Sequence, residues 1–179
     1  MARSDYLPAR SLEALLMACT TPNRLALLVS MQTGLRIGDV LAIHTQDIAR
    51  QRWTVTEHKT GKRRRVRVTR GLMLEVLAQS SDVWAFPGRC DPRKHRTRQA
   101  VYKDLRRAAA AFRLPAKLHV SPHTARKIYA VGKYKAGDLA GVQRLLQHSS
   151  EAVTMLYAYA DQITARKLTE AQQSRLAPI

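Results

Sequence analysis

The sequence SPHTARKIYA at residues 121–130 sets the start of a helix and places two ionisable groups near that start. Ser121 is a favoured N-cap residue and Pro122 is favoured at the first helical position, so we expect a helix over about 122–135. His123 and Arg126 are three residues apart and therefore lie on one face of it. A helix N-terminus presents free N–H groups and partial positive charge, so this turn suits a phosphate that Arg126 also contacts.

The chain continues with LLQHSSEAVTMLYAY at residues 145–159, which places Tyr157 nine residues after His148. The reference pKa of tyrosine is about 10, so a tyrosine nucleophile needs a neighbouring base or a strongly positive field. The histidines, arginines and lysines of residues 121–159 offer both. Tyr159 is two residues further on, so on a helix it points about 200° away from Tyr157 and the two cannot enter one pocket. Only one of the two tyrosines can therefore serve as the nucleophile.

Two upstream segments supply further cations, TGLRIGDVLAI at residues 33–43 and HKTGKRRRVRV at residues 58–68. Arg36 is the candidate for the second arm of an arginine clamp on phosphoryl oxygens, because the planar guanidinium bonds two oxygens at once. Lys59, on a predicted hairpin turn, can deliver a proton to a departing oxygen. Two arginines and a lysine supply the positive charge that a phosphoryl transition state needs, so we expect no metal and no cofactor.

The apolar periodicity predicts a mainly helical protein with a small antiparallel sheet, of the α+β class. We expect one domain over residues 1–179, because no repeat, linker or low-complexity tract divides it. The hairpin is predicted at 52–68, a short helical turn near 36–43 and a loop at 89–98. Helices are predicted at about 8–19, 22–33, 72–78, 97–112, 122–135, 139–147, 150–159 and 162–175.

The charge of the chain restricts the class of partner. It has 31 Lys+Arg against 13 Asp+Glu, a formal net charge of +18. Such an excess implies a polyanion, and nucleic acid is the leading candidate. The residues expected to contact DNA lie on the hairpin and in the following loop, and they are Lys62, Arg63, Arg64, Arg65, Arg67, Arg96 and Arg98.

Other compartments and sites fit less well. The basic residues fall on several elements and no apolar span of about 18 residues occurs, so we expect neither a membrane anchor nor a transmembrane helix. Cys19 and Cys90 form no sequence pair typical of a disulfide framework, and CxxC and HExxH are absent. These features fit a reducing compartment, so we expect a cytoplasmic protein that associates with the nucleoid when it binds DNA.

The ordered set of Arg36, Lys59, His123, Arg126, His148 and Tyr157 resembles the catalytic positions of the tyrosine recombinases, the phage integrase family. The resemblance covers about residues 10–175 and implies the fold of that family's catalytic domain. It implies site-specific recombination of double-stranded DNA, in which Tyr157 attacks the scissile phosphate and forms a 3′-phosphotyrosyl link.

The resemblance also implies a role for each remaining position. Arg36 and Arg126 would hold the non-bridging oxygens, and Lys59 would protonate the departing 5′-oxygen. His123 is similar to the family's general base and His148 to its second phosphate-bonding group. Asp39 matches an acidic position that braces the site from behind.

The sequence departs from the family pattern in two respects. Gln147 stands where the family usually has glycine. No core-binding or arm-binding domain is found in residues 1–179, so the chain resembles either an excised catalytic domain or a minimal member such as the fimbrial-switch invertases, and we expect weaker DNA affinity. The tail at about 161–179 is expected to dock in trans within a homotetramer on DNA, with a monomer in its absence. An accessory DNA-bending or directionality protein is a further potential partner.

Simpler interpretations exist for each residue alone. Arg36 would be a surface or salt-bridged arginine paired with Asp39, and the basic hairpin would be solvated. His123 and His148 would be structural histidines, and Tyr157 a packing residue. At the level of function, a type IB topoisomerase-like activity and a non-catalytic DNA-binding regulator remain open. The ordered co-occurrence of all six residues favours the recombinase.

Overall fold

A computed structural model of the protein describes residues 4–115 and 117–138. It confirms the predicted class, because helices predominate and the one pairing of named strands in this part is antiparallel. The predictions for His148, Tyr157 and the tail fall outside the described residues. In chain order the elements are α1 (Ala9–Leu16), α2 (Thr21–Thr33), α3 (Ile37–Leu41), α4 (Thr45–Ile48), β1 (Arg52–Thr56), β2 (Arg63–Arg67), α5 (Arg70–Leu77), α6 (Arg98–Ala111) and α7 (Pro122–Lys135).

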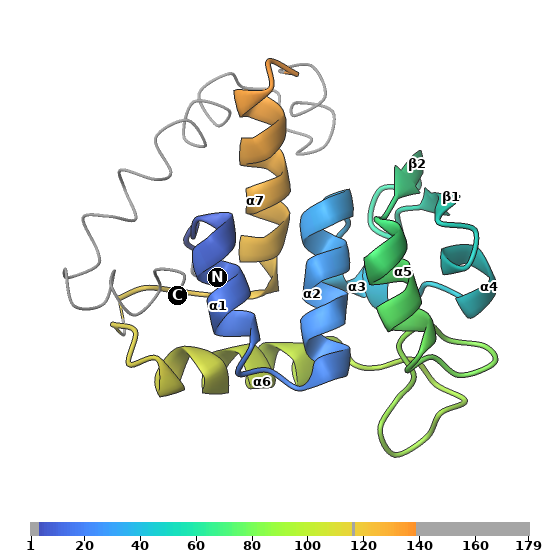
Figure 1. The fold of residues 1–179 in the computed structure, drawn as a ribbon, viewed down its shortest axis with the longest axis horizontal. Coiled ribbons are helices and arrows are strands. Elements are labelled where there is room, and N and C mark those ends of the chain that lie inside the picture. The colour runs from blue at the N-terminus through green and yellow to red at the C-terminus, as the bar shows by residue number, and fades with distance from the viewer. Residues whose placement is uncertain (1–3, 116, 139–179) are drawn as a thin grey trace.

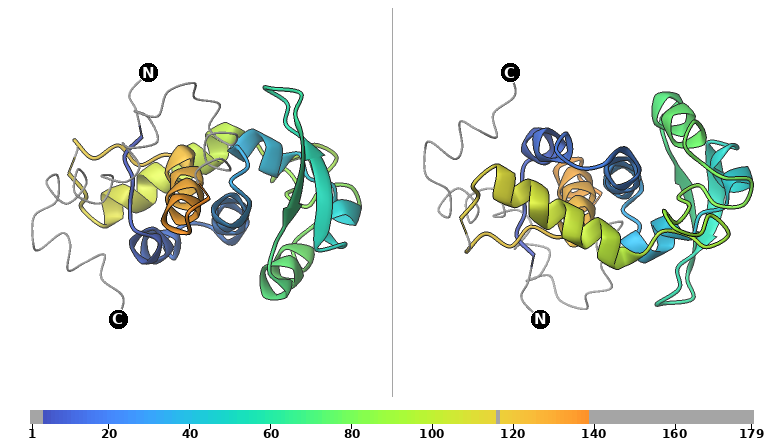
Figure 2. Two further views of the ribbon diagram at one scale, coloured as in Figure 1. Left: turned by 90° about the horizontal axis from the view of Figure 1, so that it is seen from above. Right: turned by 90° about the horizontal axis from the view of Figure 1, so that it is seen from below.

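Helix α2 occupies the centre of the molecule. Leu25, Leu27 and Val29 are fully buried, which is why a helix that is apolar on several sides belongs there. Helix α7 packs along α2, and α6 crosses beneath both of them (Figures 1 and 2). The hairpin lies on the opposite side of α2 from α1, together with α4 and α5 (Figure 1). One apolar core connects these layers.

The hairpin pairs its strands in the register that its alternating pattern predicts. Trp53 lies opposite Val66 on the buried face, and Arg52 lies opposite Arg67 on the exposed face. Successive side chains of a strand point to opposite faces, so the two faces of this small sheet differ sharply in composition. Gly61 has a φ of +65° in the connection between the strands, a conformation that glycine adopts without strain.

The structure differs from the prediction mainly in the short elements. Helix α4 was not predicted, because four residues are too few to show a helical period. Helix α1 ends at Leu16, short of the predicted residue 19, whereas α7 has the predicted bounds. Within the part of the chain that is described, no helix is long and apolar enough to cross a membrane.

Candidate active site

The N-terminus of α7 has the predicted cap. The Ser121 side chain accepts a hydrogen bond from the His123 backbone N–H at 3.3 Å, and the Thr124 hydroxyl oxygen accepts one from the Ser121 N–H at 3.3 Å. This reciprocal pair is a capping box, and it holds the first turn in place. His123 is only partly exposed to solvent, whereas Arg126, one turn later, is buried.

The junction between α2 and α3 positions Arg36. Gly34 ends α2 with a φ of 67°, and the Tyr129 ring of α7 fills the space that a Cβ at Gly34 would need. Leu35 is fully buried, and Arg36 follows as the residue that precedes α3. The close approach of Gly34 to Tyr129 therefore fixes the position of Arg36 relative to α7.

Four cations act on His123. Its pKa lies below the ordinary value because of partial burial first, and then because of the charges of Arg126, Arg36, Lys127 and Lys59, in that order. These charges come from α7, from the start of α3 and from the hairpin tip, where Lys59 is exposed. The structure thus brings four of the six predicted catalytic residues into one electrostatic cluster. A neutral imidazole at neutral pH suits a proton acceptor.

Glu57 is the residue of this cluster that the sequence reasoning missed. It is 5% exposed and forms ion pairs with Arg36 and with Arg64, the latter at 3.4 Å between Nε and Oε1. A carboxylate between two guanidinium groups restricts the orientation of both. The signal that could have found it is the strand period, because Trp53 and Val55 point inward and residue 57 continues that row.

Asp39 connects α3 to the hairpin. Its Oδ1 accepts a hydrogen bond from the His58 backbone N–H at 2.9 Å, next to Lys59, and its carboxylate is buried. The simpler interpretation, in which Arg36 is a surface or salt-bridged arginine paired with Asp39, is right that Arg36 forms a salt bridge and wrong about its partner, which is Glu57. The physical reason is that Asp39 points to the hairpin backbone.

The predicted DNA-binding residues divide into two groups. Lys62, Arg63, Arg65 and Arg67 are exposed, and exposed Arg98 lies against Gly38 of α3, where a Cβ would be 3.4 Å from its Cδ. Arg64 and Arg96 do not belong to this exposed set. Arg64 points to the inner face and Glu57. Arg96 is half-buried and donates to Asn23 Oδ1 at 3.4 Å, and burial lowers its pKa.

Comparison with known proteins assigns this chain to a protein family. Residues 5–163 match the phage integrase family. The probable integrase/recombinase YoeC of Bacillus subtilis is 32% identical over 142 residues, which are 76% of each chain. The tyrosine recombinase XerD of Bradyrhizobium diazoefficiens is 31% identical over 172 residues, 87% of this chain and 52% of that protein.

Solved structures show the same fold. The catalytic domain of bacteriophage HP1 integrase has a TM-score of 0.61 at 19% identity, over 98% of this chain and 100% of that domain. A lambda integrase(75-356) dimer bound to a core site has a TM-score of 0.66 at 20% identity, over 88% of this chain and 60% of that one. The chain spans about half the length of XerD and 43% of the phage P2 integrase. The protein belongs to the phage integrase family.

Proposed function

We propose that the protein is a site-specific DNA recombinase that cleaves and rejoins strands through a 3′-phosphotyrosyl intermediate. Membership of the phage integrase family supports the reaction class. The observation that supports the assignment of residues is that the charges of Arg126, Arg36 and Lys59 all lower the pKa of His123. A phosphodiester is an anion, and preorganised cations around a base are what its transfer requires.

The proposed step exchanges one phosphoester bond for another. The Tyr157 phenolic oxygen attacks the scissile phosphorus, and the bond from phosphorus to the 5′-oxygen breaks. His123 accepts the phenolic proton, and Lys59 donates a proton to the departing 5′-oxygen. Arg36, Arg126 and His148 hold the non-bridging oxygens. Rejoining is the reverse reaction with a 5′-hydroxyl of another strand, so the phosphoester bond energy is conserved and the reaction consumes no ATP.

Two residues would act through others in this scheme. Glu57 would hold the Arg36 guanidinium in its productive orientation, because it is buried and bonded to that side chain. Asp39 would fix the backbone beside Lys59 through its hydrogen bond to the His58 N–H. Both are positioning residues, because neither needs to touch the DNA.

The assembly on DNA follows from the reaction. Exchange between two duplexes needs four cleavage events, so we expect a homotetramer on double-stranded DNA and a monomer without it, acting in the cytoplasm at the nucleoid. We expect residues 1–179 to act as one catalytic domain, with the tail at about 161–179 docking on a neighbouring protomer. Deletion after Asp161 should weaken synapsis on DNA in native gels, and synapsis at full strength would contradict this.

Covalent capture tests the function. Nicked duplexes with a randomised core are incubated with the protein, and complexes that survive denaturation are isolated, sequenced and digested for peptide mass analysis. The expected result is DNA attached at its 3′ end to the peptide that contains Tyr157. Tyr157→Phe should abolish attachment and retain non-covalent binding, whereas the matched control Tyr159→Phe should still become attached.

The same experiment separates the rival functions. Attachment at Tyr157 without sequence preference, together with relaxation of a supercoiled plasmid that lacks the selected site, would support a topoisomerase-like activity instead. A folded protein that binds DNA and never becomes attached would support the non-catalytic regulator.

A further inference from the structure

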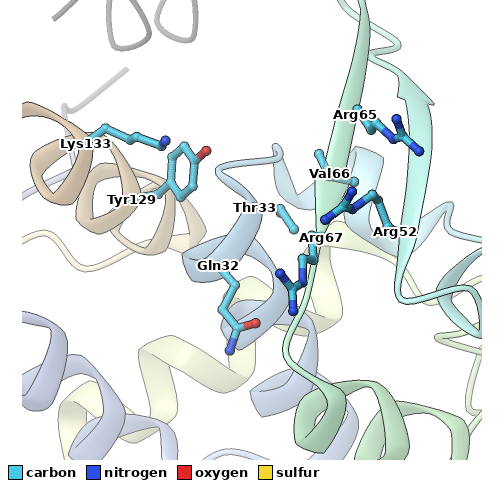
Figure 3. A pocket seen from close by; sticks show the side chains of 8 residues that line it. All are labelled: Gln32, Thr33, Arg52, Arg65, Val66, Arg67, Tyr129 and Lys133. Carbon is cyan, nitrogen blue, oxygen red and sulfur yellow. The ribbon is translucent and has the colours of Figure 1, made fainter. Parts of the chain in front are cut away.

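A cavity of about 370 Å³ lies between the end of α2, the exposed face of the hairpin and α7 (Figure 3). The Arg52 and Arg67 side chains extend toward it from the sheet, Arg65 lines its edge, and Tyr129 and Lys133 border it from α7 (Figure 3). Small-ligand sites begin at about 300 Å³, so the cavity can hold a group larger than a single ion. Its principal charged and polar lining residues are Arg52, Arg65, Arg67, Lys133, Tyr129 and Gln32.

The arginines of this cavity are arranged at an electrostatic cost. Arg52 lies directly opposite Arg67 in the strand register, and like charges in that position destabilise a sheet. Within residues 4–115 and 117–138, the side chains of Arg52, Arg65 and Arg67 form neither an ion pair nor a hydrogen bond with another residue. An anionic ligand would relieve this repulsion.

Lys133 adds a cation from the opposite wall. Its Nζ lies 6.0 Å from the centroid of the Tyr129 ring and 3.4 Å from Asp138 Oδ2. Lys133 and Asp138 form an ion pair in which both side chains are substantially exposed, and exposed ion pairs contribute little to stability. Lys133 can therefore exchange this partner for a phosphate at small cost.

The cavity adjoins the proposed reaction centre. Arg126, Tyr129 and Lys133 follow one another along one side of α7, and seven residues of helix correspond to about 10 Å. Thr33 lines the cavity and precedes Arg36 by three residues. A ligand in the cavity therefore lies near a phosphate that is held by Arg36 and Arg126.

We propose that this cavity binds a backbone phosphodiester of the DNA strand, near the scissile phosphate and distinct from it. The proposal rests on the proposed function for the identity of the DNA strand. The arginines and Lys133 neutralise the phosphate from two sides, and the Tyr129 hydroxyl donates a hydrogen bond to it. The site anchors the strand so that the scissile phosphate meets Arg36.

A scan with neutral phosphates tests this assignment. Single methylphosphonates replace each phosphate on both sides of the scissile position, and equilibrium binding is measured for the unaltered protein and for the double variant Arg52→Gln with Lys133→Gln. The double variant should bind unmodified DNA about tenfold more weakly and show a shallower dependence of affinity on salt. Arg10→Gln and Lys103→Gln together, on exposed positions of α1 and α6, are the charge-matched control.

The decisive result is a lack of additivity at one phosphate. At one position in the DNA, a methylphosphonate should weaken the affinity of the unaltered protein but cause no further loss of affinity in the double variant. Equal losses in the double variant and the control, or additive losses at every phosphate, would overturn the proposal. A third outcome would also overturn the proposal. If millimolar inorganic phosphate competes with DNA for the unaltered protein but not for the double variant, and no single methylphosphonate shows the non-additive loss, the cavity binds a free anion and not the DNA backbone. Because the readout is non-covalent binding, failure of Tyr157 attachment would reject the proposed function alone.

Discussion

The two faces of the hairpin carry the same residue type in two different electrostatic settings. On the inner face, which is the buried face that carries Trp53 and Val66, Arg64 pairs with buried Glu57, which also pairs with Arg36. On the outer face, Arg52, Arg65 and Arg67 lie exposed beside a cavity. Paired arginines have fixed positions and can orient a reaction centre, whereas arginines without an acid are available to an anionic ligand. We infer that the inner face governs catalysis and the outer face governs DNA binding.

Replacing Arg36 should have the largest effect. Arg36→Lys keeps the charge and loses the planar fork, so one of the two contacts proposed for it with the phosphoryl oxygens would be lost. We expect covalent attachment to slow by roughly a hundredfold or more, the usual cost of removing one oxyanion donor. Single-turnover attachment to a nicked duplex measures this. Arg10→Lys on α1 is the control, and a rate for Arg36→Lys close to that of the control would remove Arg36 from the reaction centre.

Replacing Glu57 tests the inner face directly. Glu57→Gln keeps the size of the side chain and removes the charge between Arg36 and Arg64. Since both arginines are partly exposed, we expect a loss of about 2 kcal/mol in the free energy of unfolding and a decrease on the order of tenfold in the rate of attachment. Denaturant unfolding and single-turnover kinetics measure the two effects. DNA affinity should not fall, because the substitution only increases the net positive charge; a lower affinity at an unaltered rate would contradict the role of Glu57.

Two glycines with similar backbone conformations separate packing from conformation. Gly34 has a φ of +67° and lies against the Tyr129 ring. Gly61 has a φ of +65°, and no atom lies within 4 Å of the position that a Cβ would occupy there. Gly61→Ala should cost about 1 kcal/mol for the left-handed conformation alone. Gly34→Ala should cost about 3 kcal/mol, because the ring must also move. Equal losses in thermal unfolding would show that the Gly34–Tyr129 contact does not determine the position of Arg36.

The titration of His123 is the smallest expected effect. Burial and the surrounding cations lower the pKa of His123 in the folded protein, so folding favours the neutral imidazole. The resulting contribution to the free energy of unfolding is therefore fully present above the pKa of the unfolded chain. It is lost as the pH falls from that value to the lower pKa of the folded protein. NMR should give a midpoint below 6.5 in the free protein, and bound DNA should raise it because phosphate charge offsets the cations. His123→Gln should remove this pH dependence. A free-protein midpoint at or above 6.5 would contradict the cluster.

The sequence predicted the parts of this structure that depend on local signals. The Ser121-Pro122 cap fixed the start of α7 and hence the places of His123 and Arg126, and strand alternation located the hairpin. The pairing of Arg36 depends on a contact across 21 residues, which periodicity does not specify. The contact between Arg96 and Asn23 spans 73 residues for the same reason. Arg64 could have been separated from its neighbours by the two-residue period, but a continuous run of basic residues conceals that alternation.

Two hairpin variants compared side by side test the division between the faces most directly. Glu57→Gln and Arg67→Gln are measured for dissociation constant and for single-turnover attachment at saturating DNA. This division predicts that the larger effect of Glu57→Gln is on the attachment rate and that the larger effect of Arg67→Gln is on the dissociation constant. The reverse pattern, or the same balance of effects in both variants, would contradict it.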